Sequence, residues 1–594
     1  MTRTPLRPLA RILSAREKGE NPDAIERENI RLRAESARDK ARLRAEGRLL
    51  VLSLFFFAAF SAIGARMGLL ASVEPEEPAI AGVGSPIIAQ RADIVDRNGR
   101  VLATNLVTHS LYAQPQQMIE PARVARELAS IFPDLKEDQL VKDFTGSRKF
   151  LWIRRKLSPE QMQAVHDIGD PGLLFGPREM RLYPNGKLAS HILGGAGFGR
   201  EGVSSAEVIG TAGVEKIYDD YLRDPANGGE PLELSIDLSV QAAAEQILAG
   251  GVKLMNAKGA TSILMDVHTG EVISMVSYPD FDPNDRPLPP VKGDPSDSPL
   301  FNRAVQGLYE LGSTFKIFAA SQAIDLGLVT PSTIIDTRPF NWGRFRIKDM
   351  HNYGAQLSVL RIIEKSSNVG SARLAQMIGG PRQQDFLKRL GFLSPTTVEL
   401  TEAPGARPLL PKVWSEISSM TIAYGHGMSA SPLHLASAYA TIVNGGTRVN
   451  PTLIRQDKPV VGERVISART SDMTREMLRG VVEEGSGSTY GKVEGYDVGG
   501  KTGTAEKPLR NGRGYAHDKV IATFASAFPM SDPKYVLIVS LDEAVETSGP
   551  IPRRTAGFTA VPVAAEMIRR IAPLLGLRPE VEAPHPAALT LVRN

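Results

Sequence analysis

An uncharged apolar segment near the N-terminus constrains the possible structures of this chain more than any other feature. Residues 49–65 carry no charged side chain and include three consecutive phenylalanines, Phe55 to Phe57. With the residues that follow Arg66, the segment is long enough to cross a bilayer once as a helix. We therefore predict a transmembrane anchor at residues 49–70, with folded domains after it.

The two sides of this segment differ in charge. Residues 1–48 contain 13 Lys or Arg and 8 Asp or Glu, whereas residues 71–86 contain three Glu, three Pro and no basic residue. Because basic residues stay on the cytoplasmic side, we predict a cytoplasmic N-terminus, with the rest of the chain outside the cytoplasm. A cleaved signal peptide is the alternative, but its basic region would be far longer than usual.

The composition excludes several classes of protein. The 594 residues are 42% hydrophobic and 23% charged, which suits two or more globular domains. The net charge is only +4, and the basic residues are not interleaved with aromatic ones, so nucleic acid is not an expected partner. The chain has no cysteine, and its nine histidines lack metal-binding spacing. We expect neither a metal nor an organic cofactor.

Residues 87–228 predict a mixed α/β domain without a catalytic cluster. A strand-like segment at 87–95 and a second one after the turn Asp96–Arg100 give a hairpin signal. Helical segments follow at 121–131 and 158–167. We interpret this part of the chain as a structural pedestal.

The next domain predicts an α+β fold. Strands at 259–265 and 271–276 precede a run of helices that includes 432–443, and strands at 496–498, 522–528 and 535–541 follow it. This order favours one antiparallel sheet in which early and late strands meet, with a helical subdomain inserted between them. The predicted divisions are a cytoplasmic tail at 1–48, an anchor at 49–70, a linker at 71–86, a pedestal at 87–228, a second domain at 229–575 and a C-terminal tail at 576–594.

Ser313 and Lys316 form the first candidate catalytic pair. If Ser313 opens a helix, Lys316 lies one turn further on the same face, so its amine can reach the serine hydroxyl. The helix N-terminus would also favour an oxyanion. The same S-x-x-K letters recur at 531–534, but Pro533 predicts a turn there. One short motif alone does not establish a site.

Two further motifs follow in a fixed order. Ser366-Ser367-Asn368 lies at a break in the predicted helix 357–378, and Lys501-Thr502-Gly503 precedes the late strands. The patterns S-x-N and K-T-G each occur once in the chain. Chance assembly of all three motifs in this order within one domain is improbable.

Each residue type suits one part of an acyl transfer. Ser313 is the candidate nucleophile, and Lys316 is its proton acceptor once desolvation and nearby cations lower its pKa. The Ser366 hydroxyl can return that proton to a leaving amine. Asn368 can hold Lys316 together with a substrate amide.

The third motif suits the substrate side of the reaction. Lys501 supplies a positive field, and Thr502 can bind a substrate carboxylate through its hydroxyl. Gly503 has no side chain to obstruct an extended peptide that lies against an edge strand. The backbone N–H groups of Ser313 and Thr504 are the expected oxyanion hole, where loss of one donor typically costs roughly a hundredfold in rate.

Together these motifs resemble those of class B penicillin-binding proteins of the cell-division type, with Ser367 in place of the aspartate in the general S-D-N pattern. The likeness covers nearly the whole chain. Further segments that carry it are Arg91–Gly99, Arg181–Pro184, Gly213–Lys216, Leu234–Asp237, Asn302–Ala304 and Ala438–Gly446.

The resemblance implies a peptidoglycan D,D-transpeptidase of the septal cell wall. Such an enzyme attacks the D-Ala-D-Ala bond of one stem peptide, holds an acyl-enzyme on Ser313 and passes it to an amine of a neighbouring stem. β-Lactams would acylate the same serine. The resemblance also implies a single-pass protein of the bacterial inner membrane with a periplasmic catalytic domain, an FtsW-type glycosyltransferase as partner and further division proteins.

Other functions remain open from the sequence. The segment Tyr424–Ser429 is more similar to the division enzymes than to an elongation-type transpeptidase, and Leu311 stands where many relatives carry proline. A D,D-carboxypeptidase or β-lactamase-like hydrolase would need a water-activating base, for which Glu402 is a candidate. A non-catalytic division scaffold or β-lactam sensor would keep the fold without turnover.

Overall fold

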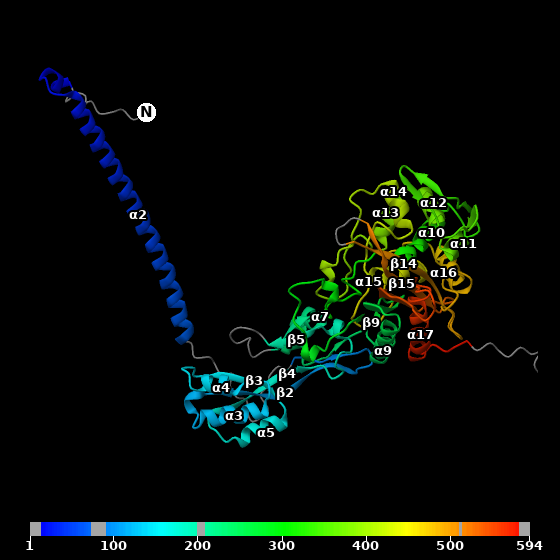
Figure 1. Ribbon diagram of the computed structural model, residues 1–594, viewed down its shortest axis with the longest axis horizontal. Coiled ribbons are helices and arrows are strands. Elements are labelled where there is room, and N and C mark those ends of the chain that lie inside the picture. The colour runs from blue at the N-terminus through cyan, green and yellow to red at the C-terminus, as the bar shows by residue number, and fades with distance from the viewer. Residues whose placement is uncertain (1–12, 73–90, 199–207, 510–513, 581–594) are drawn as a thin grey trace, which may run out of the picture. The chain divides into compact units, whose positions relative to one another are not determined.

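The computed structural model describes residues 13–72, 91–198, 208–509 and 514–580. The chain forms two units, Met1–Ile87 and Ile88–Asn594 (Figure 1). Each unit is described by itself below.

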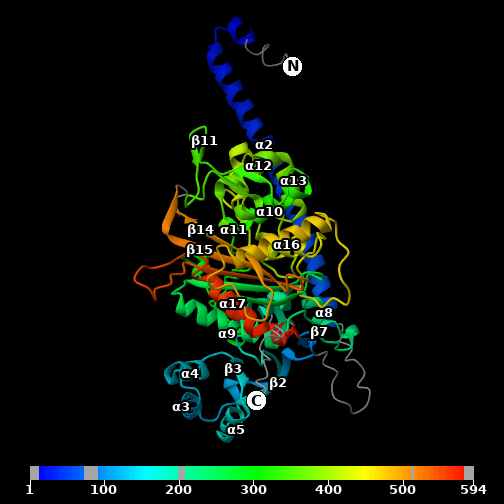
Figure 2. The same cartoon turned by 90° about the vertical axis from the view of Figure 1, so that its right-hand side faces the viewer.

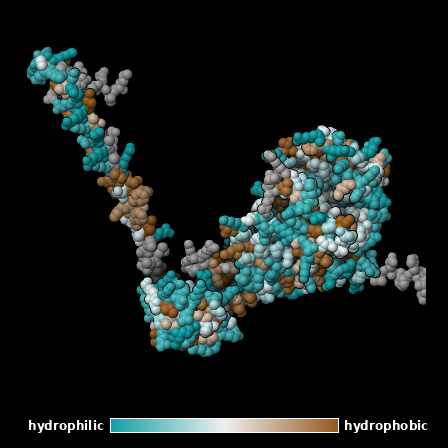
Figure 3. Space-filling view, viewed as in Figure 1, coloured by the Kyte–Doolittle hydropathy of each residue, from teal (hydrophilic) through white to brown (hydrophobic). Residues whose placement is uncertain are grey.

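The first unit contains one long helix, α2 (Pro22–Ser72). Within it, Glu46–Arg66 is long and apolar enough to cross a membrane, and none of that window is buried in the protein. Figure 3 shows hydrophobic residues gathered in this part of the helix and hydrophilic residues over its N-terminal part. Phe55 and Phe57 are 68% and 73% exposed, which in water would be unfavourable. The predicted anchor at residues 49–70 lies within α2 and overlaps this apolar window.

The pedestal is built on a five-stranded sheet of order β3-β2-β1-β7, with β4 also paired to β2. The predicted hairpin is present, because Val95 pairs with Val101 and the Asp96 N–H donates to the Arg100 carbonyl. Residues 87–90 of its first predicted strand lie outside the described residues, and the strand begins only at Ile94. The strands are β1 (Ile94–Val95), β2 (Val101–Ala113), β3 (Leu151–Leu157), β4 (Leu173–Leu182) and β7 (Leu232–Glu233).

Three helices cover this sheet, and both helices predicted here are confirmed. They are α3 (Pro121–Ile131), α4 (Glu137–Phe144) and α5 (Pro159–Asp167). The Ser158 side chain caps α5 in a capping box with Gln161, which explains why this helix starts where the sequence predicts. Shorter elements follow, namely α6 (Ser190–Leu193), β5 (Gly195–Phe198), β6 (Val208–Ala212), α7 (Gly213–Ile217) and α8 (Asp219–Arg223).

A buried ion cluster joins three of the pedestal segments that carry the family resemblance. Glu215 is fully buried and binds Arg91 and Arg181, each at 2.6 Å. The Tyr183 hydroxyl donates to the same carboxylate at 3.2 Å, and Arg91 also pairs with Asp219 at 2.7 Å. Buried charges need such partners, so the cluster requires all of these residues together.

The second domain is built on an antiparallel sheet of order β14-β15-β16-β8-β9. The early strand β8 pairs with the late strand β16, from Gly259 opposite Asp542 to Asp266 opposite Tyr535, as the sequence predicts. The predicted strand at 496–498 is not formed: Tyr496 makes only an isolated bridge to Val493, and β14 begins at Gly499. The strands are β8 (Gly259–Asp266), β9 (Val272–Tyr278), β14 (Gly499–Pro508), β15 (Tyr515–Phe528) and β16 (Tyr535–Asp542).

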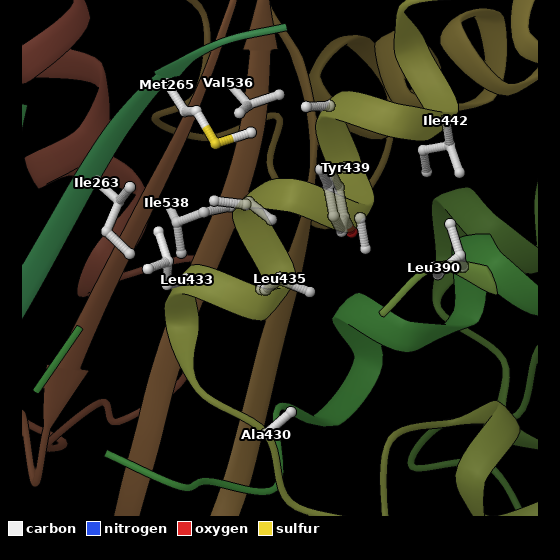
Figure 4. Close-up of a cluster of buried hydrophobic side chains, with 14 of the residues drawn as sticks. Ile263, Met265, Leu390, Ala430, Leu433, Leu435, Tyr439, Ile442, Val536 and Ile538 are labelled. Carbon is white, nitrogen blue, oxygen red and sulfur yellow. The ribbon is translucent and has the colours of Figure 1, made fainter. Parts of the chain in front are cut away.

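Both faces of this sheet are covered. Helices α9 (Leu238–Leu254) and α17 (Ala560–Leu574) pack together against one face (Figures 1 and 2). Helix α15 (Pro432–Val443) packs against the other face, where Figure 4 shows its side chains with Ile263 and Met265 of β8. Successive residues of a strand point to opposite faces of the sheet. Because helices cover both faces, the residues on each face are apolar, and the strands are continuous hydrophobic segments in the sequence.

The predicted helical insertion is present, and its long helix breaks where the sequence indicates. Helix α11 (Val359–Lys365) ends before Ser366, and α12 (Asn368–Ile378) begins two residues later with Ser367 as its cap. The other helices are α10 (Lys316–Asp325), α13 (Gly380–Arg389), α14 (Glu416–Ala423) and α16 (Ala468–Glu483), with short strands β10 (Ile334–Asp336), β11 (Phe340–Trp342), β12 (Phe345–Ile347) and β13 (Gln356–Ser358).

Candidate active site

Ser313 lies in a single 3-10 turn rather than at the start of an α-helix. The turn η6 spans Gly312–Phe315, and α10 begins at Lys316, whose N–H donates to the Ser313 carbonyl. The Thr314 hydroxyl donates to the Leu311 carbonyl at 2.8 Å and closes the turn. Ser313 and Lys316 therefore remain one turn apart, as predicted, although the turn is tighter.

Aromatic side chains pack against the buried side of this turn and stabilise it. Phe315 packs against Phe392 in a tilted arrangement and Phe318 packs against it edge to face, at ring distances of 4.8 and 5.3 Å. The buried Tyr439 hydroxyl donates to the Thr314 carbonyl at 2.8 Å. Leu311 is only 2% exposed and packs in the same core as these aromatic residues.

The segment Tyr424–Ser429 lies directly against the turn. The Gly312 N–H donates to the Gly425 carbonyl at 3.1 Å, and a Cβ on Gly425 would lie 1.8 Å from the Gly312 carbonyl oxygen. Gly425 also has a positive φ of +87°, so this position requires glycine. Glu310 adds a second link through His426 at 2.9 Å.

The three motifs meet at the hydroxyl of Ser366. The Lys316 amine lies 3.1 Å from the Ser366 hydroxyl and 2.5 Å from its carbonyl oxygen. The Lys501 amine lies 3.0 Å from the same hydroxyl. Ser366 has a left-handed backbone, with φ of +61°, which is costly for a residue with a Cβ and aims its side chain at both lysines.

Both lysine amines have lowered pKa values. Burial, and then the charge of Lys501, hold the pKa of Lys316 well below its ordinary value. Burial lowers the pKa of Lys501 from 10.5 to about 7. Desolvation penalises the charged form of each amine, so the site favours at least one neutral lysine at neutral pH. A neutral amine beside a serine turn is what general-base chemistry needs.

The S-x-N motif is held by a residue that the sequence reasoning missed. The Asp349 carboxylate accepts the Ser367 hydroxyl at 2.7 Å and the Val369 N–H at 3.0 Å. The Asn368 amide donates to the Lys348 carbonyl at 3.5 Å. The predicted hydrogen bond between Asn368 and Lys316 does not occur among the described residues. The Lys316 amine donates to the Ser366 hydroxyl instead. No sequence pattern marks Asp349, because its partners lie 18 and 20 residues away.

The K-T-G motif lies near the start of the edge strand β14, which begins at Gly499. Thr502 shares a hydrogen bond with Ser486 at 2.7 Å, and the Thr504 hydroxyl accepts the Ala556 N–H at 3.0 Å. A Cβ on Gly503 would lie 2.4 Å from the Leu311 carbonyl oxygen. Glycine is therefore required because β14 packs against the turn that carries Ser313, a reason different from the open peptide path we expected.

Two other candidates lie elsewhere. Glu402, the candidate base of a hydrolase, accepts the Asn302 amide at 2.8 Å. Ser531, of the second S-x-x-K match, lies in the turn between β15 and β16, as predicted. Within the described ranges, no group of three or more His, Asp or Glu is placed to hold a metal ion.

Comparisons with known proteins identify the pedestal and the second domain by family. The model described as "Penicillin binding protein transpeptidase domain" matches residues 260–568. The model described as "Penicillin-binding Protein dimerisation domain" matches residues 86–233. The two matches cover the predicted catalytic domain and pedestal in the predicted order.

Curated relatives agree with these matches. The chain is 34% identical over 560 residues to a probable peptidoglycan D,D-transpeptidase FtsI of Caulobacter vibrioides, covering 92% of each chain. It is 28% identical over 479 residues to FtsI of Escherichia coli K12, covering 77% of this chain and 80% of the relative.

A solved structure shares the fold. The crystal structure of penicillin-binding protein 3 from Mycobacterium tuberculosis in complex with aztreonam matches with a TM-score of 0.63 at 24% identity, covering 83% of this chain and 97% of the other. From the site geometry, the matched domains and the near full-length relatives, the chain belongs to the penicillin-binding protein transpeptidases, the family of the FtsI peptidoglycan D,D-transpeptidases.

Proposed function

We propose that Ser313 is the nucleophile of a peptidoglycan D,D-transpeptidase that cross-links stem peptides of the septal wall. The observation that carries the proposal is the convergence of Lys316 and Lys501 on one hydroxyl, that of Ser366, at 3.1 and 3.0 Å. Three motifs that are far apart in the chain thus form one reactive centre beside the Ser313 turn.

The first step forms an acyl-enzyme. Neutral Lys316 takes the Ser313 proton, and the Ser313 oxygen attacks the carbonyl carbon of the D-Ala-D-Ala bond. The backbone N–H groups of Ser313 and Thr504 stabilise the oxyanion. When the C–N bond breaks, the proton on Lys316 passes through the Ser366 hydroxyl to the leaving amine, and D-Ala departs.

The strand β14 orients the donor peptide in this step. Lys501, when charged, and the Thr502 hydroxyl bind the terminal carboxylate of the donor. Because β14 is the edge strand of its sheet, its free backbone edge suits an extended peptide. The Thr502 hydroxyl, which shares a hydrogen bond with Ser486, would exchange that partner for the substrate.

The second step transfers the acyl group. An amine of a neighbouring stem attacks the ester carbonyl and gives a proton to Lys316, the bond to the Ser313 oxygen breaks, and Lys316 passes that proton to the Ser313 oxygen. β-Lactams would follow the first step and stop there, because their ring opens without releasing a leaving group.

The helix α2 supports a membrane-anchored enzyme. We place the N-terminus of the chain in the cytoplasm and the catalytic domain in the periplasm, because the residues before the apolar segment are basic and those after it are acidic. We also infer an FtsW-type glycosyltransferase as partner. Small residues would allow a second helix to pack closely against the anchor; they are Ala58, Ala59, Ser61, Ala62 and Gly64.

Labelling with a fluorescent penicillin tests the nucleophile. The wild-type protein should be labelled covalently, and Ser313→Ala should abolish labelling. Ser531→Ala, in the second S-x-x-K match, is the matched control and should label like wild type. An unlabelled wild-type protein, or full labelling of Ser313→Ala, would contradict the proposal and favour a non-catalytic scaffold.

Product analysis with two stem peptides then separates the enzyme classes. A transpeptidase yields a peptide dimer, whereas a hydrolase yields only the shortened peptide. Loss of the dimer in Ser313→Ala must accompany loss of labelling if one serine performs both steps.

A further inference from the structure

A cavity borders the S-x-N motif. It has a volume of about 570 Å³. Most of its wall is the loop that joins β12 to β13, and the remainder comes from the three residues after β10 and from Arg346 in β12. We call it the basic cavity; it is lined by Thr337, Arg338, Pro339, Arg346, Lys348, Asp349, Met350, His351, Asn352, Tyr353, Gly354 and Ala355.

Hydrogen bonds give this cavity a defined wall. The Thr337 N–H donates to the Ala355 carbonyl at 2.9 Å, and the Thr337 hydroxyl donates to the Gly354 carbonyl at 3.1 Å. The Asn352 side chain accepts the Gly354 N–H at 3.0 Å. These contacts continue the β10–β13 pairing into the loop. The cavity is therefore a built feature of the fold.

The charge of the cavity is positive. Arg346 and Lys348 are exposed, and neither forms an ion pair with any residue that the structure describes. Arg338 is neutralised by Asp336 at 2.7 Å. The one lining carboxylate, Asp349, is already engaged by the S-x-N motif. Two unopposed cations at one opening favour a ligand with a carboxylate.

The cavity adjoins the reactive centre through short contacts. Lys348 binds the Asn368 amide through its carbonyl, and Asp349 binds Ser367. Ser366, which precedes Ser367 in the chain, lies between the two catalytic lysines, Lys316 and Lys501. The donor carboxylate already has Lys501 and Thr502 on β14. The cations of the basic cavity are thus available to a second substrate.

An exposed aromatic pair extends this surface. Trp342 and Phe345 pair across the β11–β12 hairpin and are 37% and 47% exposed. Figure 2 shows β11 projecting from the body of the domain. Exposed aromatic residues beside a charged cavity are typical of a binding surface.

We propose that the basic cavity binds a carboxylate of the acceptor stem peptide, whose amine then attacks the acyl-enzyme. The inference rests on the proposed transpeptidase function. In the reaction, the amine nitrogen bonds to the acyl carbon, the bond to the Ser313 oxygen breaks, and the amine proton reaches that oxygen through Lys316. Arg346 and Lys348 hold the acceptor and take no part in the proton transfer.

Partition of one acyl-enzyme tests this assignment. The full chain in detergent is acylated with a synthetic thioester of a D-Ala peptide, and an acceptor stem peptide competes with water. The measured quantity is the ratio of aminolysis to hydrolysis, which is independent of the amount of active enzyme. The double variant Arg346→Glu with Lys348→Glu should lower this ratio roughly tenfold, the size of one charge-assisted contact. Lys458→Glu, an exposed lysine in another loop, should keep the wild-type ratio.

A second acceptor separates binding from a structural effect. With the acceptor carboxylates converted to carboxamides, the wild-type ratio should fall, and the double variant should show little further loss. An equal fall of the variant with both acceptors, or an unchanged ratio with the charged acceptor, would overturn the assignment. Failure of the wild-type protein to form any acyl-enzyme would instead refute the proposed function.

Discussion

Replacement of Lys501 by methionine should stabilise the protein while abolishing its activity. Lys501 is fully buried, and burial lowers its pKa from 10.5 to about 7. The unfolded chain therefore binds a proton up to pH 10.5, whereas the folded protein binds it only up to about pH 7. The native state pays a stability cost that is full below pH 7 and disappears above pH 10.5.

The size of this effect follows from the pKa difference. A difference of about 3.5 pH units corresponds to about 5 kcal/mol at pH 6 and falls to about 1–2 kcal/mol at pH 9.5. Methionine has a similar volume and carries no charge, so it removes the cost. It also removes the hydrogen bonds of Lys501 to Ser366 and to the Thr502 carbonyl, which contribute about 1 kcal/mol each. The net gain is about 3 kcal/mol at pH 6 and about zero at pH 9.5.

Thermal unfolding at several pH values measures this effect. Lys501→Met should melt roughly 3–6 °C above wild type at pH 6, and the two curves should converge by pH 9.5. Lys458→Met replaces an exposed lysine and should show no pH-dependent difference. A Lys501→Met protein that is less stable than wild type at pH 6, or a difference that does not change with pH, would refute the lowered pKa.

Three further predictions concern the same centre. Gly503→Ala places a methyl group 2.4 Å from the Leu311 carbonyl oxygen, and should lower the melting temperature and abolish penicillin labelling; normal labelling would show that β14 can move away. Ser366→Ala removes the hydroxyl between Lys316 and Lys501 and should slow acylation roughly 10²–10⁴-fold, measured by stopped-flow labelling; an unchanged rate would exclude Ser366 from proton transfer. Acylation should follow a bell-shaped pH profile, rising as Lys316 loses its proton and falling as Lys501 loses its own near pH 7; a rate that rises steadily to pH 10 would exclude a requirement for charged Lys501.

Local signals in the sequence predicted several elements to within one residue. Helix α3 and helix α15 have the predicted bounds because each begins with a proline at its first turn. The capping serine of α5 has the same effect. Predictions failed where local signals were weak or where backbone geometry depends on packing. Residues 496–498 have strand-like composition, but only Tyr496 pairs, in an isolated bridge with Val493.

The candidate site shows the same division. The order of the motifs predicted which residues meet, but the tight 3-10 turn at Ser313 comes from its packing against Gly425 and Tyr439. Asp349 had no signal at all, since an isolated aspartate in a loop has no pattern to distinguish it. The close approach that requires glycine at position 503 had no sequence signal, because the contact with Leu311 joins segments that are far apart in the chain.

The amino-acid sequence alone determined the apolar helix that is able to cross a membrane, the order of the domains and the chemical types of the groups that we propose to react, because these depend on runs of neighbouring residues. Only the tertiary structure decided how those groups behave. Ser366 contacts lysines that lie 50 and 135 residues away, and burial of both amines in the folded domain lowers their pKa values. Desolvation and long-range contact arise only when the chain is packed, so reactivity is a property of the fold.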